Sequence, residues 1–325
     1  MPMNKAPSAI GIVVIGRNEG ERLRVCLRSV VGAGDTVVYV DSGSTDDSVA
    51  LARNVGAVVV PLDMNVPFTA ARARNAGFHA LLSREPAVQF VQFVDGDCEV
   101  LPDWPQAGQA FLEQHVAYAV VSGRLRERHP ERSVYNRLCD AEWNTPVGEA
   151  KACGGIALMR AAAFSAVDGF REDLIAGEEP ELCLRLRAAG WKIWRLDHDM
   201  ALHDAAMTHW RQWWRRSVRG GFGFAQGAWL HGRGKERHWV AETRRAVLWG
   251  IALPVLIVAA MFWWGAPALL LWLVYPLQVL RLYVRQKDAA RAFFLVLGKF
   301  AEGWGVLKFV FKHLMRQRQT LIEYK

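Results

Sequence analysis

Residues 89–97 read QFVQFVDGD, an apolar run that ends in two aspartates separated by one glycine. An apolar run of this length, followed by turn residues, is typical of a buried strand. Similar runs lie at 10–15, 36–40 and 57–60, and helical patterns separate them. Strands that alternate with helices predict βαβ units, an α/β fold and a mainly parallel sheet.

Polar side chains directly follow two of these runs. Asp41 begins the turn DSGSTD at 41–46, and Asp95 and Asp97 end the fourth run. Ligands of such sheets bind at the carboxyl ends of the strands. The sequence therefore predicts a ligand site along this edge. Between 124 and 150 the periodicity fades, which predicts a surface excursion.

Charge is divided unevenly along the chain, which has 325 residues and a formal net charge of +8. Residues 1–204 hold 21 Lys and Arg against 27 Asp and Glu, a net −6, while residues 205–325 hold 19 against 5, a net +14. We expect no nucleic-acid partner, because the N-terminal part lacks a basic groove. Five cysteines without a CxxC pair argue against a disulfide scaffold or a structural zinc site.

The basic part contains 35 residues, between Arg245 and Arg281, without a single Asp, Glu, Lys or Arg. A membrane crossing needs about 20 apolar helical residues. We therefore predict two transmembrane helices, at about 246–264 and 268–284, which form a hairpin. Basic residues flank both outer ends, which indicates that both ends face the cytoplasm. The alternative is the buried core of a soluble domain.

A third apolar segment, at about 293–311, contains Lys299, Glu302 and Lys308. Those charges favour an amphipathic helix in the membrane interface over a third crossing. The predicted organisation is thus a domain over 1–235 and a membrane-associated helical region over 236–325.

The two aspartates of 95–97 suit a hard cation. Mg²⁺ takes one or two carboxylates together with phosphate oxygens, so Asp95 and Asp97 would suit a metal-bound diphosphate. A solvated turn at a strand end is the alternative. His203, beyond a predicted strand at 191–196, is either a further metal ligand or a surface histidine.

Several residues suit the remaining parts of a diphosphate substrate. Asp41 would accept hydrogen bonds from a nucleoside. The alternative is that its turn, which includes Ser44, only caps the helix that follows. Three basic or amide side chains lie near the start of a predicted helix and would bind phosphate; they are Arg72, Arg74 and Asn75. The alternative is a solvated basic face. The stretch with Arg215 and Arg216 would bind either a diphosphate or anionic lipid headgroups. The alternative is an amphipathic helix that packs against the membrane segment.

Glu178 and Glu179 precede Pro180, at the predicted start of a helix that runs to about 189. The helix dipole stabilises a carboxylate there as an anion, which suits a general base. Ordinary acidic residues of a first helical turn are the alternative.

Together and in this order, these motifs resemble those of the family 2 glycosyltransferases with a GT-A fold, over about residues 8–230. The segments that carry the resemblance are 13–19 with Arg17 and Glu19, 41–46, 72–77, 95–97, 153–155, 177–183 and 215–216.

The resemblance implies roles for these residues. Asp97 would be the more direct ligand of Mg²⁺ or Mn²⁺, and Gly154 and Gly155 would lie on the acceptor side. The remaining motif residues, including Arg17 and Glu19, would contact the donor. The family's catalytic base is usually the aspartate of a Glu-Asp pair. Here Glu179 occupies that place, and we favour it over Glu178.

The implied function is a metal-dependent, inverting transfer of a sugar from a nucleotide-diphosphate sugar to a hydroxyl acceptor. A lipid-linked or polysaccharide precursor at the cytoplasmic face of the cell inner membrane would be that acceptor. The alternatives are a Rossmann-like enzyme that uses NAD or S-adenosylmethionine, against which the absence of GxGxxG counts, and a non-catalytic, membrane-anchored nucleotide-sugar-binding protein.

Overall fold

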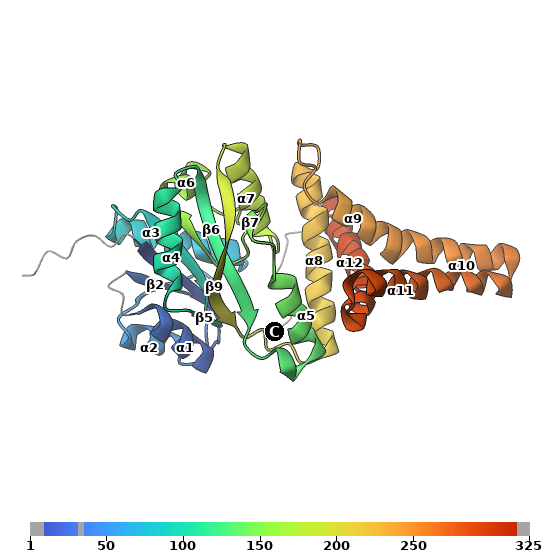
Figure 1. The fold of residues 1–325 in the computed structure, drawn as a ribbon, viewed down its shortest axis with the longest axis horizontal. Helices are drawn as coiled ribbons and strands as arrows, with labels where there is room; N and C mark the ends of the chain where they lie inside the picture. Colours follow the sequence, from blue (N-terminus) through green and yellow to red (C-terminus); the bar gives the residue numbers. More distant parts are fainter. Residues whose placement is uncertain (1–9, 32–35, 317–325) are drawn as a thin grey trace, which may run out of the picture. The chain divides into compact units, whose positions relative to one another are not determined.

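The computed structural model describes residues 10–31 and 36–316. The chain divides into two compact units (Figure 1). The first contains residues up to 132, 139–173 and 178–206, and the second contains 133–138, 174–177 and the chain from 207. The predicted domain boundary at residue 235 stays a prediction, and the outermost residues of both predicted domains lie outside the described part.

The first unit contains one mixed nine-stranded sheet with the order β3-β2-β1-β4-β8-β6-β9-β5, and β7 also pairs with β9. Strands β1 to β4 are parallel, as the sequence predicted, whereas β8 is antiparallel to both β4 and β6. The strands are β1 Ile10–Gly16, β2 Val37–Asp41, β3 Val58–Pro61, β4 Phe90–Asp95, β5 Cys98–Val100, β6 Tyr118–Glu127, β7 Gly148–Glu149, β8 Ala157–Arg160 and β9 Lys192–His203.

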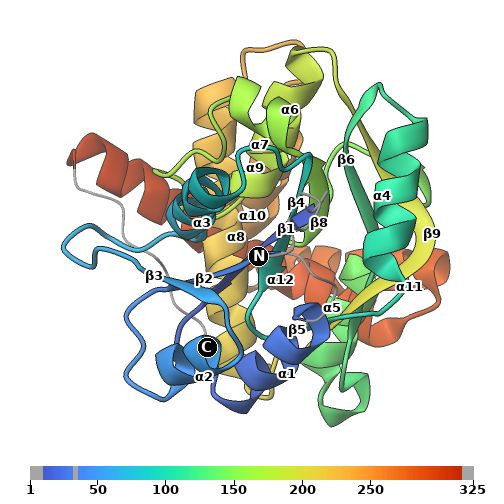
Figure 2. The same ribbon diagram turned by 90° about the vertical axis from the view of Figure 1, so that its left-hand side faces the viewer.

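Helices cover both faces of this sheet (Figure 2). Successive side chains of a strand point to opposite faces, so Val13 belongs to the core cluster shared with α3, α6 and α7, while Val14 belongs to the one shared with α1, α2 and α4. The helices of the first unit are α1 Glu21–Val30, α2 Ser48–Asn54, α3 Ala70–Arg84, α4 Trp104–Gln114, α6 Ala161–Ala166 and α7 Glu178–Ala188.

The segment 124–150 differs from the predicted surface excursion. Strand β6 continues to Glu127, and a 3-10 turn (η1 Pro130–Arg132) leads to helix α5, Val134–Trp143. Arg124 is 6% exposed and donates to Asp140 Oδ1 at 2.8 Å, so an ion pair with one buried member ties α5 to β6 where the apolar periodicity fades.

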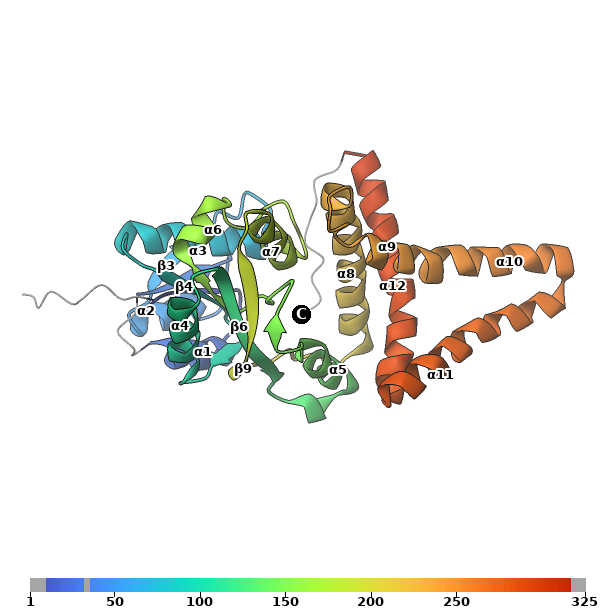
Figure 3. The ribbon, with the colours of Figure 1, turned by 45° about the horizontal axis from the view of Figure 1, so that its top comes forward.

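The second unit is helical (Figure 3). Its helices are α8 Trp210–His231, α9 Val240–Val247, the π-helical η2 Leu248–Ala252, α10 Leu253–Trp264, the 3-10 helix η3 Ala266–Leu273, α11 Val274–Gln286 and α12 Ala289–Leu314. Two continuous helical segments, Val240–Trp264 and Ala266–Gln286, are long and apolar enough to cross a membrane. They contain both predicted transmembrane helices.

Helix α12 packs closely against α8 and η2 through glycines. A side chain added at Gly221 or Gly250 would collide with the backbone of α12, and one added at Gly305 would collide with that of α8. Close helix contact through small residues is typical of helices in membranes. The placement of this third segment in the membrane interface stays a prediction.

Candidate active site

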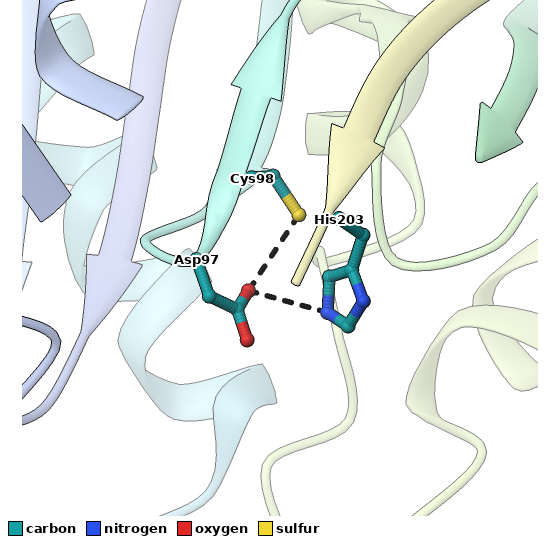
Figure 4. Close-up of side chains that lie close together, drawn as sticks. All are labelled: Asp97, Cys98 and His203. Atoms are coloured by element: carbon teal, nitrogen blue, oxygen red, sulfur yellow. Dashed lines mark hydrogen bonds and ion pairs between the residues drawn. The ribbon is translucent and has the colours of Figure 1, made fainter. Parts of the chain in front are cut away.

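Asp97 follows β4 and its carboxylate lies beside the last residue of β9. Oδ1 of Asp97 lies 3.2 Å from Nε2 of His203, and the Cys98 thiol lies 3.5 Å from the same oxygen (Figure 4). Asp97 is 5% exposed, and the His203 side chain is 12% exposed, with its ring 4.6 Å from the ring of Trp143 at nearly a right angle. His203 is therefore not an exposed surface histidine.

These residues fit a divalent cation. Octahedral coordination of Mg²⁺ at about 2.1 Å separates neighbouring ligand atoms by about 3.0 Å, close to the 3.2 Å between Asp97 and His203. Nδ1 of His203 is buried and has no hydrogen-bond partner among the described residues, so the ring is not committed elsewhere through that nitrogen. A carboxylate with an imidazole suits Mn²⁺ as well.

Arg74 of α3 connects the end of β4 to the start of α7. Its guanidinium donates to Asp95 Oδ1 at 2.7 Å and to Glu178 Oε1 at 2.9 Å, and the side chain is 3% exposed. Burial lowers the pKa of Arg74, but the negative charges of Asp95 and Glu178 outweigh that effect and the pKa is raised. The buried ion therefore stays charged and holds both carboxylates.

Glu179 lies next to this bridge and is buried. Its Oε1 accepts hydrogen bonds from the backbone N–H of Cys153 at 2.6 Å and from the thiols of Cys153 and Cys183 at 3.1 and 3.0 Å. Burial raises the pKa of the Glu179 carboxyl, and these hydrogen bonds only partly offset the rise. A carboxylate with a raised pKa is a stronger base, which suits proton abstraction at neutral pH.

Gly155 comes close to the Arg74 bridge. A Cβ added there would lie 3.0 Å from Nη2 of Arg74 and 3.3 Å from Oδ2 of Asp95, so a larger residue would press on the ion pair. Gly154 has a positive φ of 85°, which favours glycine. Their predicted position on the acceptor side stays a prediction.

Asp41 organises the turn after β2. Its Oδ2 accepts from the backbone N–H groups of Gly43 and Ser44, and Tyr39 donates to its Oδ1. Ser44 Oγ accepts from the N–H of Asn18, which ties this turn to the one after β1. A carboxylate has about four lone-pair sites, so Asp41 can still accept a donor from a nucleoside.

The other predicted donor-binding residues are placed differently. Arg72 donates to the backbone oxygens of Asp63, Val66 and Pro67, and Asn75 is bonded to Phe170 and Glu172. Both side chains hold loops of the first unit.

The remaining members of the predicted donor set lie elsewhere. Glu19 pairs with Arg22 at 2.8 Å, and Arg17 is exposed in the turn after β1. Arg215 and Arg216 lie on α8 of the second unit. Binding of a donor by any of these residues stays a prediction.

Sequence reasoning missed the cysteines of both acidic clusters. In the described residues, two groups bring three metal-binding side chains within 4.8 Å of one another: Asp97, Cys98 and His203, and Cys153, Glu179 and Cys183. Cys98 adjoins Asp97 in the sequence and could have been noticed. Cys153 lies 30 positions from Cys183, so no local spacing joins them.

Comparisons with known proteins agree with this description. Residues 11–165 match the sequence model of Glycosyl transferase family 2. An uncharacterized glycosyltransferase of Rickettsia conorii is 44% identical over 59 residues, which are 18% of this chain. The matched segment spans about a fifth, 21%, of that relative's length.

Solved structures show the same fold over most of the chain. A mannosyltransferase of Pyrobaculum calidifontis, in complex with GDP-Man and Mn²⁺, is 18% identical with a TM-score of 0.64, covering 94% of this chain and 90% of that one. S. aureus TarS 1-349 is 14% identical with a TM-score of 0.53, covering 95% and 92%. Residues 11–165 of this chain therefore match Glycosyl transferase family 2, and the chain shares the GT-A fold of these solved structures.

Proposed function

We propose that this protein is a metal-dependent, inverting glycosyltransferase that moves a sugar from a nucleotide-diphosphate sugar to a hydroxyl acceptor. One observation carries the proposal: Arg74 ties Asp95, two residues from the metal candidate Asp97, to Glu178, next to the base candidate Glu179. The buried bridge keeps the metal-binding and proton-accepting carboxylates on elements that are fixed to each other.

The donor would bind along the carboxyl edge of the parallel strands, with its nucleoside near Asp41. Asp97 and His203 would hold Mg²⁺ or Mn²⁺, which neutralises charge that develops on the leaving diphosphate. Glu179 accepts the proton of the acceptor hydroxyl as the oxygen attacks the anomeric carbon, and the bond from that carbon to the diphosphate oxygen breaks. A single displacement from the opposite side inverts the anomeric configuration.

The acceptor would be a lipid-linked or polysaccharide precursor at the cytoplasmic face of the inner membrane. The apolar segments Val240–Trp264 and Ala266–Gln286 support this, because they would keep the enzyme at the bilayer where such acceptors reside. Basic side chains at both outer ends of the pair favour cytoplasmic ends and contact with anionic headgroups.

A screen of nucleotide-diphosphate sugars tests the donor class. With Mn²⁺ present, we expect one donor to raise the melting temperature of the full-length chain in detergent, because a ligand that binds only the folded state stabilises it. The same donor should give a smaller rise with Asp97→Ala and none without metal. A rise with NAD or S-adenosylmethionine instead of any nucleotide sugar would favour the Rossmann-like alternative.

A non-catalytic binding protein would give the same melting shift. Release of the nucleoside diphosphate distinguishes the two, since a binding module has no use for a base. We expect the wild type to release the nucleoside diphosphate when metal is present. If the donor binds but no nucleoside diphosphate is released with any acceptor or metal, the binding protein is favoured.

A further inference from the structure

Cys153, Glu179 and Cys183 form a second group of metal-binding side chains, separate from Asp97 and His203. Cys153 lies in the loop after β7, and Glu179 and Cys183 lie on one face of α7, four residues apart. The three contacting atoms are mutually close: the two Sγ atoms are 3.7 Å apart, and they lie 3.1 and 3.0 Å from Glu179 Oε1.

The two thiols are in hydrogen-bond contact without a covalent bond, and the same separation suits two thiolates on one metal ion. A disulfide requires about 2.05 Å between sulfurs. Two thiolates bound to tetrahedral Zn²⁺ at about 2.3 Å lie about 3.8 Å apart, close to the 3.7 Å observed. In such a site, a sulfur ligand atom and an oxygen ligand atom lie about 3.5 Å apart. The carboxylate oxygen would therefore move outward by about 0.5 Å on binding, a shift within the range of side-chain adjustment.

The surroundings also suit a soft cation. Cys183 and Glu179 are buried, whereas Cys153 is half-buried, so an ion can enter from solvent on the side of Cys153. Two thiolates and one carboxylate around a divalent ion leave one net negative charge. The positive charge of Arg187 acts on Cys183 and offsets part of it. Thiolates select soft ions, in contrast to the harder Asp97 and His203 pair.

We propose that Cys153, Cys183 and Glu179 form a binding site for Zn²⁺ or a similar soft divalent ion, and that its occupation inhibits the enzyme. Binding forms two metal–sulfur bonds and one metal–oxygen bond, and the two thiol protons leave to solvent; no oxidant or reductant takes part. A carboxylate oxygen bound to the ion no longer accepts the proton of the acceptor hydroxyl. The inhibition, though not the binding, rests on the proposed function of Glu179.

Titration of the reduced full-length chain with Co²⁺ tests the binding directly. Co²⁺ is a spectroscopic substitute for Zn²⁺, and a thiolate ligand gives it a charge-transfer band. We expect this band to saturate at one ion per chain, to fall by at least half with Cys153→Ser or Cys183→Ser, and to persist with Cys139→Ser, which alters a buried cysteine on α5. Absence of the band in the wild type, or full intensity in both site variants, would overturn the site.

Thiol alkylation of the wild type serves as a second measurement that needs no variant. The peptide that contains the half-buried Cys153 should be alkylated more slowly with Zn²⁺ present than without it. An equal rate of alkylation with and without Zn²⁺ would contradict the proposal.

Inhibition is measured separately, as turnover with Mn²⁺ and added Zn²⁺ relative to the same variant with Mn²⁺ alone. We expect at least tenfold weaker inhibition in Cys183→Ser than in the wild type. Equal inhibition, with the cobalt band confirmed, would overturn the regulatory role and leave the binding site. A chain with the cobalt band but without any glycosyl transfer would instead contradict the proposed function.

Discussion

The guanidinium of Arg74 donates to Oδ1 of Asp95 at 2.7 Å, so the carboxylate at the end of β4 is held by a buried positive charge. The same guanidinium donates to Glu178 at 2.9 Å. Carboxylates from two elements that are 83 residues apart in the sequence are thereby joined through one side chain of α3. This bridge anchors the segments that carry Asp97, two residues from Asp95, and Glu179, next to Glu178.

Arg74→Met should strongly destabilise the protein. The substitution leaves Asp95 and Glu178 without their buried partner, and loss of one member of a buried ion pair costs about 3–5 kcal/mol. We expect a fall of about 3 kcal/mol in the free energy of unfolding, since Asp95 is partly exposed and can be solvated. Denaturation of the full-length chain, followed by tryptophan fluorescence, measures it.

Arg24→Met is the matched control for the bridge. Arg24 pairs with Glu21 at 2.9 Å, but both side chains are exposed, at 41% and 73%. Exposed pairs contribute about 0–1 kcal/mol. Equal destabilisation by the two substitutions would show that the Arg74 bridge is no more than a surface interaction.

His203→Ala should weaken the metal dependence of donor turnover. Removal of an imidazole that binds the ion should raise the Mn²⁺ concentration for half-maximal turnover by at least about tenfold, because even residues behind the ligands contribute that much. His198→Ala, on the same strand, should leave the metal requirement unchanged. A metal titration of both variants measures this, and an unchanged midpoint in His203→Ala would remove His203 from the site.

On the acidic side of the pH profile, turnover should be lost at a higher pH than it would be with a glutamate base of ordinary pKa. Burial raises the pKa of Glu179, and a base acts only when it is ionised, so turnover should increase as the pH rises through that raised value. A pH profile of turnover at saturating donor measures the limb. Its position should move to still higher pH in Cys183→Ala, which removes one thiol hydrogen bond to Glu179; an identical profile would contradict this role of the thiol.

The outer ends of the apolar segments Val240–Trp264 and Ala266–Gln286 should both face the cytoplasm, and the turn between the segments should face the opposite side of the membrane. Ala266→Cys places a thiol on an exposed residue of that turn, and Gln286→Cys places one at the other end of the second segment. An impermeant maleimide added to intact cells should label the first variant above the wild-type level and leave the second unlabelled. Labelling in the opposite pattern would reverse the topology.

Sequence patterns predicted the parallel half of the sheet well, because its strands are apolar on both faces. Strand β9 was expected at 191–196 and instead extends to His203. Asp197, His198 and Asp199 interrupt its apolar pattern, and pairing with β5 and β6 holds the second half in the sheet. That extension is what brings His203 to Asp97.

Residues far apart in the sequence limited prediction of the site. The motifs identified the carboxylates Asp97 and Glu179 as candidates, but not their neighbours. Asn75 and Arg72 have the chemistry of phosphate ligands, and only the folded positions of the loops at 63–67 and 170–172 show that these side chains also donate to oxygens of those loops. The thiols around Glu179 come from a loop and a helix whose approach no local pattern records.

Sugar transfer by membranes that contain the full-length chain tests the central claim most directly. With the donor found by the melting screen, labelled in its sugar, and with Mn²⁺, we expect label to enter an acceptor in the wild type. Transfer should fall at least about a hundredfold in Asp97→Ala and in Glu179→Gln, equivalent to about 2.7 kcal/mol of transition-state stabilisation, while Glu179→Gln still binds the donor. Undiminished transfer in either variant would contradict the account.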